Sequence, residues 1–120
     1  MASLALDVAF EMHRQYGPGL FERVYEEIFC YELNKRGIEY KRQFGIPLLH
    51  EEIKMEVCFI ADVILENKLI IELKSVESLS DLHYKQLLTY LKLSGIKLGL
   101  LINFNTALLK NGIRRIANNL

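Results

Sequence analysis

Apolar residues recur at helical spacing in three separate segments of this chain. The segments Leu4–Tyr16, Leu20–Arg36 and Asp81–Ser94 each place apolar side chains three or four positions apart, with charged residues between them. This spacing gathers the apolar side chains on one face of a helix. A glycine, which ends helices readily, directly follows each segment. The pattern therefore predicts three amphipathic helices, with Ser78 or Ser80 as the N-cap of the third.

Between the second and third of these segments the chain changes to short apolar runs typical of strands. The runs are Ile38–Phe44, Ile46–His50 and Ile53–Ile60. Glu51 and Glu52 fit the tip between the last two, and Gly45 predicts an irregularity between the first two. Pro47 has no N–H to donate, so it should lie on a sheet edge or at a bulge. These runs predict part of an antiparallel meander.

The meander continues into a hairpin. Two apolar runs, Val63–Leu65 and Leu69–Ile71, flank a polar turn centred on Asn67, which is the pattern of a β-hairpin. Because Asp62 and Glu72 are equally far from Asn67, they should lie directly across from each other. Side chains alternate between the two faces of a strand. The opposite face then carries apolar side chains, namely Val63, Leu65, Leu69, Ile71 and Leu73.

Alternation also places Lys74 on the face of Asp62 and Glu72. Two opposed carboxylates repel each other, and burying either one costs desolvation free energy. A proton could neutralise one carboxylate, Lys74 could pair with both, or a divalent cation could bind between them. Oxygen ligands on fixed strands suit Mg²⁺ or Mn²⁺. The competing interpretation is a surface salt bridge of Lys74, which would contribute little to stability.

The last third of the chain contains one further clear strand. The run Lys97–Phe104 is almost entirely apolar and follows the third helix. It therefore completes a β-α-β unit and should lie parallel to the strand before that helix. The remaining segment, Thr106–Asn119, has apolar residues at spacings that predict a final helix.

Three polar residues on the predicted helices have two interpretations each. Glu22 lies in the first turn of the second helix, where it could complement the helix dipole or supply a third carboxylate to the site. Gln86 and Tyr90 lie four residues apart on one stripe of the third helix. This stripe could face solvent or the site, and the pattern alone does not distinguish these alternatives.

Composition limits the class of protein. The chain has 120 residues, of which 51% are hydrophobic and 25% charged, so one compact domain over residues 1–120 is expected. Lys plus Arg equals Asp plus Glu at 15 each, which argues against a dedicated nucleic-acid-binding module. Cys30 and Cys58 do not make a disulfide framework and should be small interior side chains.

The same composition bears on location. No apolar run approaches the roughly 18–20 residues that span a bilayer. The first residues lack a basic start followed by an apolar block, so no signal peptide is expected. These features predict a soluble, cytoplasmic protein that does not bind membranes.

The predicted order of helix, three strands, helix and strand resembles the PD-(D/E)xK (restriction-endonuclease-like) superfamily of phosphodiesterases, whose core is αβββαβ. Within it, the chain is most similar to the small prokaryotic GxxExxY proteins, whose signature matches Gly19-Leu20-Phe21-Glu22-Arg23-Val24-Tyr25. Ala61-Asp62 and Ile71-Glu72-Leu73-Lys74 match the superfamily's Asp and Glu-x-Lys. Gln86–Leu91 and Gly99–Phe104 also resemble the family. This resemblance implies an α/β fold with a mixed central sheet, flanking helices and an extra N-terminal helix.

The resemblance also assigns roles to individual residues. The residues that it places in the catalytic site are Glu22, Asp62, Glu72, Lys74, Gln86 and Tyr90. The three carboxylates would hold Mg²⁺, with Mn²⁺ as a substitute and the Leu73 carbonyl as an extra ligand. Lys74 would position the attacking water, and the two residues of the third helix would orient substrate or the lysine.

The function that follows is a Mg²⁺-dependent nuclease that hydrolyses DNA or RNA. The alternative is a catalytically idle nucleic-acid-binding or accessory module that keeps the nuclease fold, which is motivated by a chain too small to carry its own target-recognition domain. A homodimer is expected by analogy, since cutting two strands needs two sites.

Overall fold

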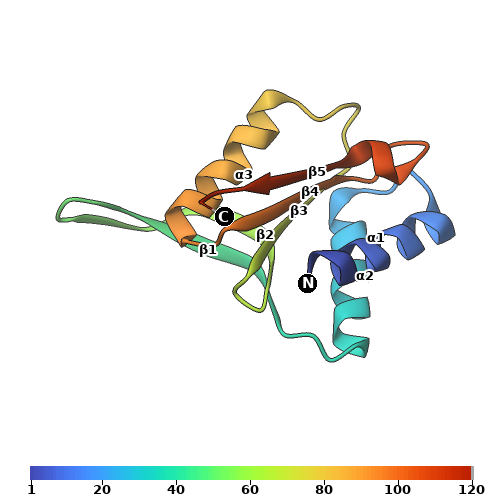
Figure 1. Cartoon of the computed structure of the whole chain (residues 1–120), viewed down its shortest axis with the longest axis horizontal. Coiled ribbons are helices and arrows are strands. Elements are labelled where there is room, and N and C mark those ends of the chain that lie inside the picture. The colour runs from blue at the N-terminus through green and yellow to red at the C-terminus, as the bar shows by residue number, and fades with distance from the viewer. Residues whose placement is uncertain (120) are drawn as a thin grey trace.

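The computed structural model describes residues 1–119, apart from the side chains of residues 57 and 58. Within them, a mixed sheet lies between helices on both of its faces (Figure 1). The helices are α1 (Ala2–Tyr16), α2 (Glu22–Lys35) and α3 (Asp81–Ser94). The strands are β1 (Tyr40–His50), β2 (Ile53–Leu65), β3 (Leu69–Lys74), β4 (Leu98–Asn103) and β5 (Ile113–Ala117), with a 3-10 turn η1 (Leu109–Gly112). The α/β class and the restriction-endonuclease-like arrangement with an additional N-terminal helix are confirmed.

The sheet has the strand order β1-β2-β3-β4-β5. The first three strands are antiparallel, as the meander predicted, and β4 lies parallel to β3. A parallel neighbour requires a long crossover, which α3 supplies. Ser80 caps this helix through its hydroxyl, and Gly95 ends it in a left-handed conformation.

The predicted division of the meander into short strands is wrong in two places. The run Ile53–Ile60 continues without a break into the hairpin, so both belong to β2. Gly45 pairs regularly with Ile60, and the register instead shifts between Ile46 and Leu48. The residue between them is Pro47, which cannot donate to the ladder and lies on the edge strand, as predicted.

The predicted helix over Thr106–Asn119 is also wrong. The structure has η1 followed by β5, which pairs antiparallel with β4. Gly112 packs so closely on β4 that an added Cβ would clash with the Asn103 carbonyl oxygen. A free edge on the buried strand β4 would leave its backbone groups without partners, and β5 supplies them. Pairing with a distant strand therefore outweighs the local periodicity.

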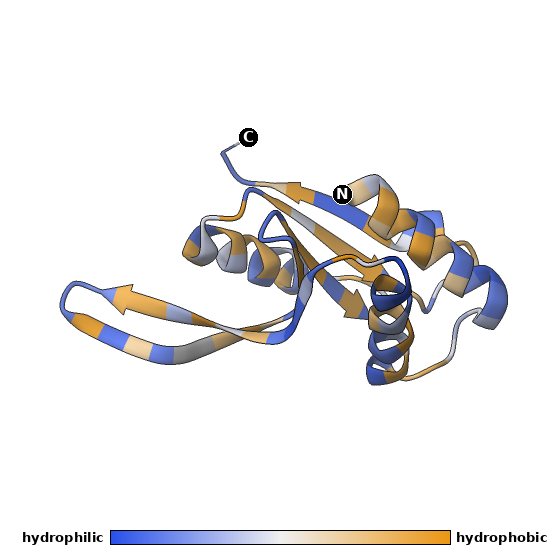
Figure 2. Ribbon diagram, turned by 90° about the horizontal axis from the view of Figure 1, so that it is seen from below, coloured by the Kyte–Doolittle hydropathy of each residue, from blue (hydrophilic) through white to orange (hydrophobic). Residues whose placement is uncertain are grey.

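Each face of the sheet is covered by its own apolar cluster. On one face, Val63, Leu65, Leu69, Ile71 and Leu73 pack with side chains of α1 and α2, as the alternation predicted. On the other face, Ile64 and Ile70 pack beneath Leu87, Tyr90 and Leu91 of α3. Figure 2 shows the strands between these helices coloured mainly hydrophobic. The sheet face that carries Asp62 and Glu72 is therefore partly covered by α3.

The halves of β1 and β2 next to the turn that joins them, up to His50 and Ile53, form an arm that projects from the rest of the protein (Figure 1). Leu49 and Ile53 near its tip are exposed. Cys30 is buried, as predicted, whereas the prediction for Cys58 lies outside the described side chains. No helix in the described part of the chain is long and apolar enough to cross a membrane.

Candidate functional site

The hairpin arithmetic that placed Asp62 across from Glu72 agrees with the observed register. Val63 pairs with Ile71 and Leu65 with Leu69, so β2 and β3 fold about Asn67. Next to the Val63–Ile71 pair, backbone N–H groups of the two strands donate to carboxylate oxygens instead of backbone carbonyls. The Asp62 N–H donates to the Glu72 carboxylate at 2.7 Å, and the Leu73 N–H donates to the Asp62 carboxylate at 3.0 Å. Each acidic side chain is thus fixed against the opposite strand.

Burial and proximity make this pair of carboxylates hard to ionise. Glu72 is only 3% exposed. Burial and the neighbouring charge of Asp62 raise the pKa of Glu72 to about 8. Burial likewise raises the pKa of Asp62. Without a cation, both shifts favour a protonated carboxyl in the pair, which is one of the alternatives that the sequence left open.

Lys74 lies near the pair without forming a salt bridge to it. Its positive charge favours the ionised forms of Asp62 and Glu72 and so partly offsets the rise in their pKa values. The ion pairs found among the described residues do not include Lys74. The surface salt bridge that competed with a functional role is therefore not the arrangement adopted. An ammonium group close to the carboxylates stays available for other contacts.

A backbone carbonyl adds a third oxygen on this edge of β3. The Lys74 carbonyl accepts the Phe104 N–H at 2.9 Å and so faces β4. The Leu73 N–H faces Asp62 on β2. Because the N–H and C=O of one strand residue point to the same edge, the Leu73 carbonyl also points toward β2. Two carboxylates and a carbonyl are donors that fit Mg²⁺, which is typically held by one or two carboxylates and keeps several waters.

Glu22 lies beside the end of β3 but apart from the carboxylate pair. It is exposed in the first turn of α2, and its carboxylate accepts the Ser75 N–H at 3.2 Å. The Ser75 hydroxyl in turn donates to the Leu20 carbonyl at 2.7 Å. Among the described residues, no group of three His, Cys, Asp or Glu side chains lies close enough together to hold a metal ion. The role of Glu22 as a third ligand stays a prediction.

Tyr25 fixes the loop that carries this segment. Its hydroxyl donates to the Gly17 carbonyl at 2.6 Å and accepts the Leu20 N–H at 3.2 Å. Its ring stacks on Phe104 with centroids 4.3 Å apart. Tyr25 thus attaches the loop between α1 and α2 to the ends of β3 and β4, and so holds Glu22 next to the residue that follows Lys74.

The polar residues along one stripe of α3 have different roles, and only some of them lie near the carboxylate pair. Tyr90 is 4% exposed, and burial together with the charges of Glu72 and Asp62 raises its pKa to about 12. Its hydroxyl therefore lies close to the pair. Gln86 is exposed one turn earlier, and its side chain acts to lower the pKa of Tyr90. His83, on the same stripe, belongs to the capping box with Ser80.

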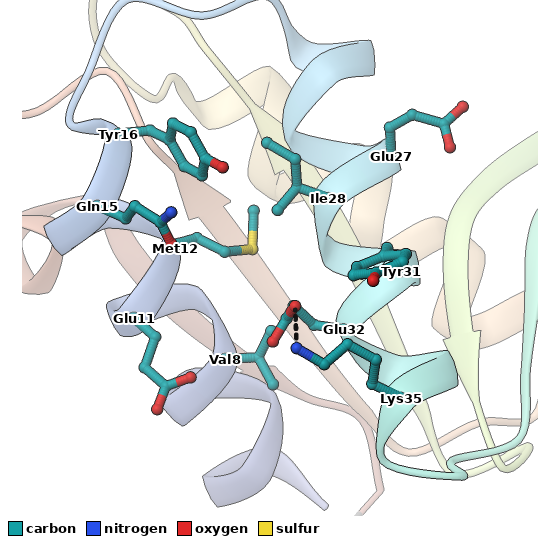
Figure 3. Close-up of a pocket in the computed structure, with 10 residues that line it drawn as sticks. All are labelled: Val8, Glu11, Met12, Gln15, Tyr16, Glu27, Ile28, Tyr31, Glu32 and Lys35. Atoms are coloured by element: carbon teal, nitrogen blue, oxygen red, sulfur yellow. Dashed lines mark hydrogen bonds and ion pairs between the residues drawn. The ribbon is translucent and has the colours of Figure 1, made fainter.

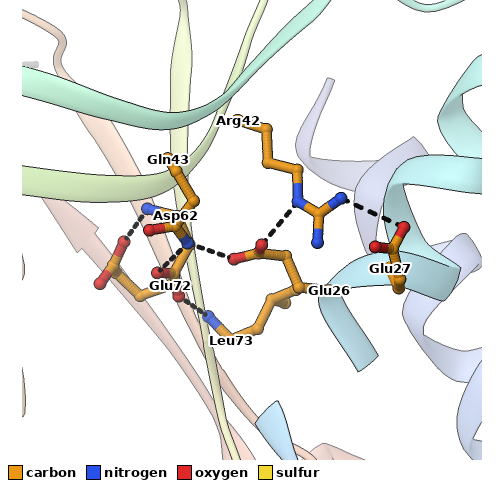
Figure 4. Close-up of polar contacts among 7 residues, drawn as sticks. All are labelled: Glu26, Glu27, Arg42, Gln43, Asp62, Glu72 and Leu73. Atoms are coloured by element: carbon orange, nitrogen blue, oxygen red, sulfur yellow. Dashed lines mark hydrogen bonds and ion pairs between the residues drawn. The ribbon is translucent and has the colours of Figure 1, made fainter. Parts of the chain in front are cut away.

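The sequence did not predict a second polar network that reaches Asp62 from β1 and α2 (Figure 4). Glu26 is 6% exposed and accepts from Arg42 Nε and from Gln43 Nε2, both at 2.6 Å. Gln43 Nε2 also donates to Asp62 Oδ1 at 3.3 Å. Glu26 could have been identified from the sequence, because it follows Glu22 by one helical turn and so lies on the same side of the helix. The position of Gln43 depends on the pairing of β1 with β2, which local patterns do not reveal.

A hollow of about 570 Å³ between α1 and α2 lies away from these residues (Figure 3). Val8, Met12 and Ile28 are among its apolar lining. Its carboxylates are already paired: Glu32 with Lys35, Glu11 with Arg36, and Glu27 with Arg42. The hollow reflects helix packing and contains none of the candidate site residues.

Comparison with known proteins gives one match. No curated protein and no solved structure matches the chain. The model of the PD-(D/E)XK nuclease superfamily matches residues 1–116, which include every residue of the site described above. The matched family and the observed fold agree with the opposed Asp62 and Glu72 and the nearby Lys74. The chain therefore belongs to the PD-(D/E)XK nuclease superfamily.

Proposed function

We propose that this protein is a metal-dependent phosphodiesterase of the GxxExxY type that hydrolyses DNA or RNA. The observation that carries the proposal is the pair of half-buried Asp62 and buried Glu72, with Lys74 nearby and in no salt bridge to either. A purely structural pair of this kind would lower stability, because two carboxylates compete for one buried place. Membership of a nuclease superfamily gives such a pair a chemical use.

The two carboxylates and the Leu73 carbonyl would hold Mg²⁺, and Mn²⁺ would substitute for it. The bound ion supplies Lewis acidity, which stabilises charge on the phosphate and eases deprotonation of a coordinated water. Any proton that burial favours on Glu72 or Asp62 would have to leave before both carboxylates could act as ligands. The Glu22 carboxylate accepts the Ser75 N–H at 3.2 Å. It would join the metal ligands from α2 once substrate or cation draws the loop between α1 and α2 closer.

Lys74 and Tyr90 would act on the substrate directly. The Lys74 ammonium would orient the attacking water and stabilise negative charge at the scissile phosphate. Because the pKa of Tyr90 is raised to about 12, its hydroxyl keeps its proton at neutral pH and can donate a hydrogen bond. Tyr90 would therefore bind a phosphate oxygen or orient a carboxylate, and Gln86 would fix its hydroxyl.

The test is a panel of single-stranded, duplex and branched DNA and RNA, incubated with Mg²⁺ or Mn²⁺. The wild type should cut at least one substrate, and Asp62→Ala and Lys74→Ala should each lose cutting. Asp7→Ala and Lys68→Ala serve as matched controls, since both residues are exposed and lie outside the site. Cutting that survives in the Asp62 and Lys74 variants would contradict the proposal.

A second candidate is a nucleic-acid-binding or accessory module without catalysis. Among the described residues, no group of three His, Cys, Asp or Glu side chains could hold a metal ion, which favours this module. Calorimetric titration with Mn²⁺ separates the two functions. Binding that Glu72→Ala abolishes supports the nuclease, whereas nucleic-acid affinity without any Mn²⁺ binding supports the accessory module. Light scattering tests the expected homodimer.

A further inference from the structure

Gln43 combines an unusual backbone conformation with a side chain that contacts two carboxylates. Its φ is +49°, in the left-handed region that non-glycine residues rarely adopt. Its neighbours keep regular pairing, Arg42 with Val63 and Phe44 with Ala61. Gln43 is thus a local distortion of the edge strand, directly across from Asp62. Such strain persists where surrounding contacts impose it, and it is often found at functional sites.

The side chain of Gln43 bridges two carboxylates from different elements (Figure 4). Its amide nitrogen lies 2.6 Å from Glu26 Oε1 and 3.3 Å from Asp62 Oδ1. Glu26 is itself buried and held by Arg42 at 2.6 Å. The shorter contact anchors the amide to α2, and the longer one leaves Asp62 room for a small adjustment.

The bridge completes the support of Asp62. One oxygen of Asp62 accepts from Gln43 on β1, and the other accepts the Leu73 N–H on β3 at 3.0 Å. Contacts from both neighbouring strands therefore set the orientation of the carboxylate. An amide does this without adding a positive charge, which a lysine or arginine would place where it repels a cation.

We infer that Gln43 is a positioning residue, which orients the Asp62 carboxylate for a divalent cation and transmits the support of the Arg42–Glu26 pair to it. This inference rests on the proposed metal-dependent function. Residues that orient metal ligands typically change metal affinity by about 10- to 100-fold when they are replaced. Removal of the Gln43 amide should weaken Mn²⁺ binding by an amount in this range.

Gln43→Gly tests the inference, with Mn²⁺ affinity measured by calorimetry. Glycine adopts positive φ without strain, so the variant should keep the fold while it loses the amide. Glu51→Gly is the matched control, because Glu51 also has a positive φ, +50°, and follows β1 at the tip of the arm, away from the site. The expected result is weaker Mn²⁺ binding in Gln43→Gly and unchanged binding in Glu51→Gly, with circular dichroism spectra like that of the wild type.

A second variant keeps the test decisive if Gln43→Gly does not fold. Gln43→Asn retains an amide and tolerates the left-handed region, but it is one methylene too short to bridge both carboxylates. It should also weaken Mn²⁺ binding. Wild-type protein that binds Mn²⁺ no better than these variants would refute the role of Gln43 alone. Wild-type protein that does not bind Mn²⁺ at all would refute the metal site and the inference together.

Discussion

Replacing Glu72 with glutamine should make the stability of the metal-free protein less dependent on pH. The pKa of Glu72 is raised from 4.5 to about 8 by burial and by the charge of Asp62. Between these two values the folded protein keeps a proton that the unfolded chain has released. The contribution of this proton to the free energy of unfolding is therefore fully present below pH 4.5 and is lost as the pH rises to about 8. Glutamine is nearly isosteric and does not titrate, so it removes this contribution.

The size of the effect follows from the linkage of one proton. The free energy of unfolding of the wild type should fall by about 1.4 kcal/mol for each pH unit between the two pKa values. For a chain of this length, that corresponds to a fall in Tm of roughly 5 °C per pH unit. Thermal unfolding followed by circular dichroism, with EDTA present and ionic strength fixed, measures this slope at several pH values in the window.

Two comparisons make the measurement specific to Glu72. Glu77→Gln removes an exposed glutamate from the linker after β3 and should keep the wild-type slope. A divalent cation at 100 times its Kd should stabilise the wild type by about 2.7 kcal/mol, and more strongly as the pH rises, because the cation displaces the proton. Parallel slopes for the wild type and Glu72→Gln would refute the view that burial of this carboxyl dominates the pH dependence.

Three further predictions concern the elements around the site, and thermal or urea unfolding measures each. Tyr25→Phe should cost about 1–3 kcal/mol, because two loop hydrogen bonds lose their shared hydroxyl, whereas Tyr31→Phe, at an exposed ring, should change little. Gly112→Ala should cost several kcal/mol, since its Cβ would clash with a β4 carbonyl; wild-type stability would contradict the close packing. Ser80→Ala should cost about 1 kcal/mol through loss of the α3 cap, and Ser78→Ala should not.

Much of the fold follows from local patterns because local chemistry determines it. The β2–β3 hairpin turns at Asn67, and such a short turn fixes the register for several residues on either side. Asp62 and Glu72 could therefore be paired from the sequence alone. Helix α3 has its predicted bounds, Asp81–Ser94, because Ser80 and Gly95 supply strong start and stop signals.

The C-terminal strand shows where this reasoning fails. Residues after Thr106 have apolar spacing that favours a helix, yet Ile113–Ala117 pairs with β4. The deciding factor is a free strand edge elsewhere in the protein, which local spacing does not contain. The close contact with the backbone at Asn103 requires glycine at position 112, which local spacing does not reveal either.

In the candidate site, too, local patterns predict some residues, whereas others come together only through long-range strand pairing. The acidic pair and Lys74 are encoded by one hairpin, so the sequence predicted them together. The support of Asp62 comes from Glu26 on α2 and Gln43 on β1, and the latter contact needs both the pairing of β1 with β2 and a left-handed backbone. No local pattern predicts positive φ at a glutamine within a strand. This distortion and the raised pKa of Glu72 both lower stability, and they converge on the same carboxylates. A cation that binds between these carboxylates would recover part of that free energy, which is why metal affinity and pH-dependent stability are the measurements that should respond most to changes at this site.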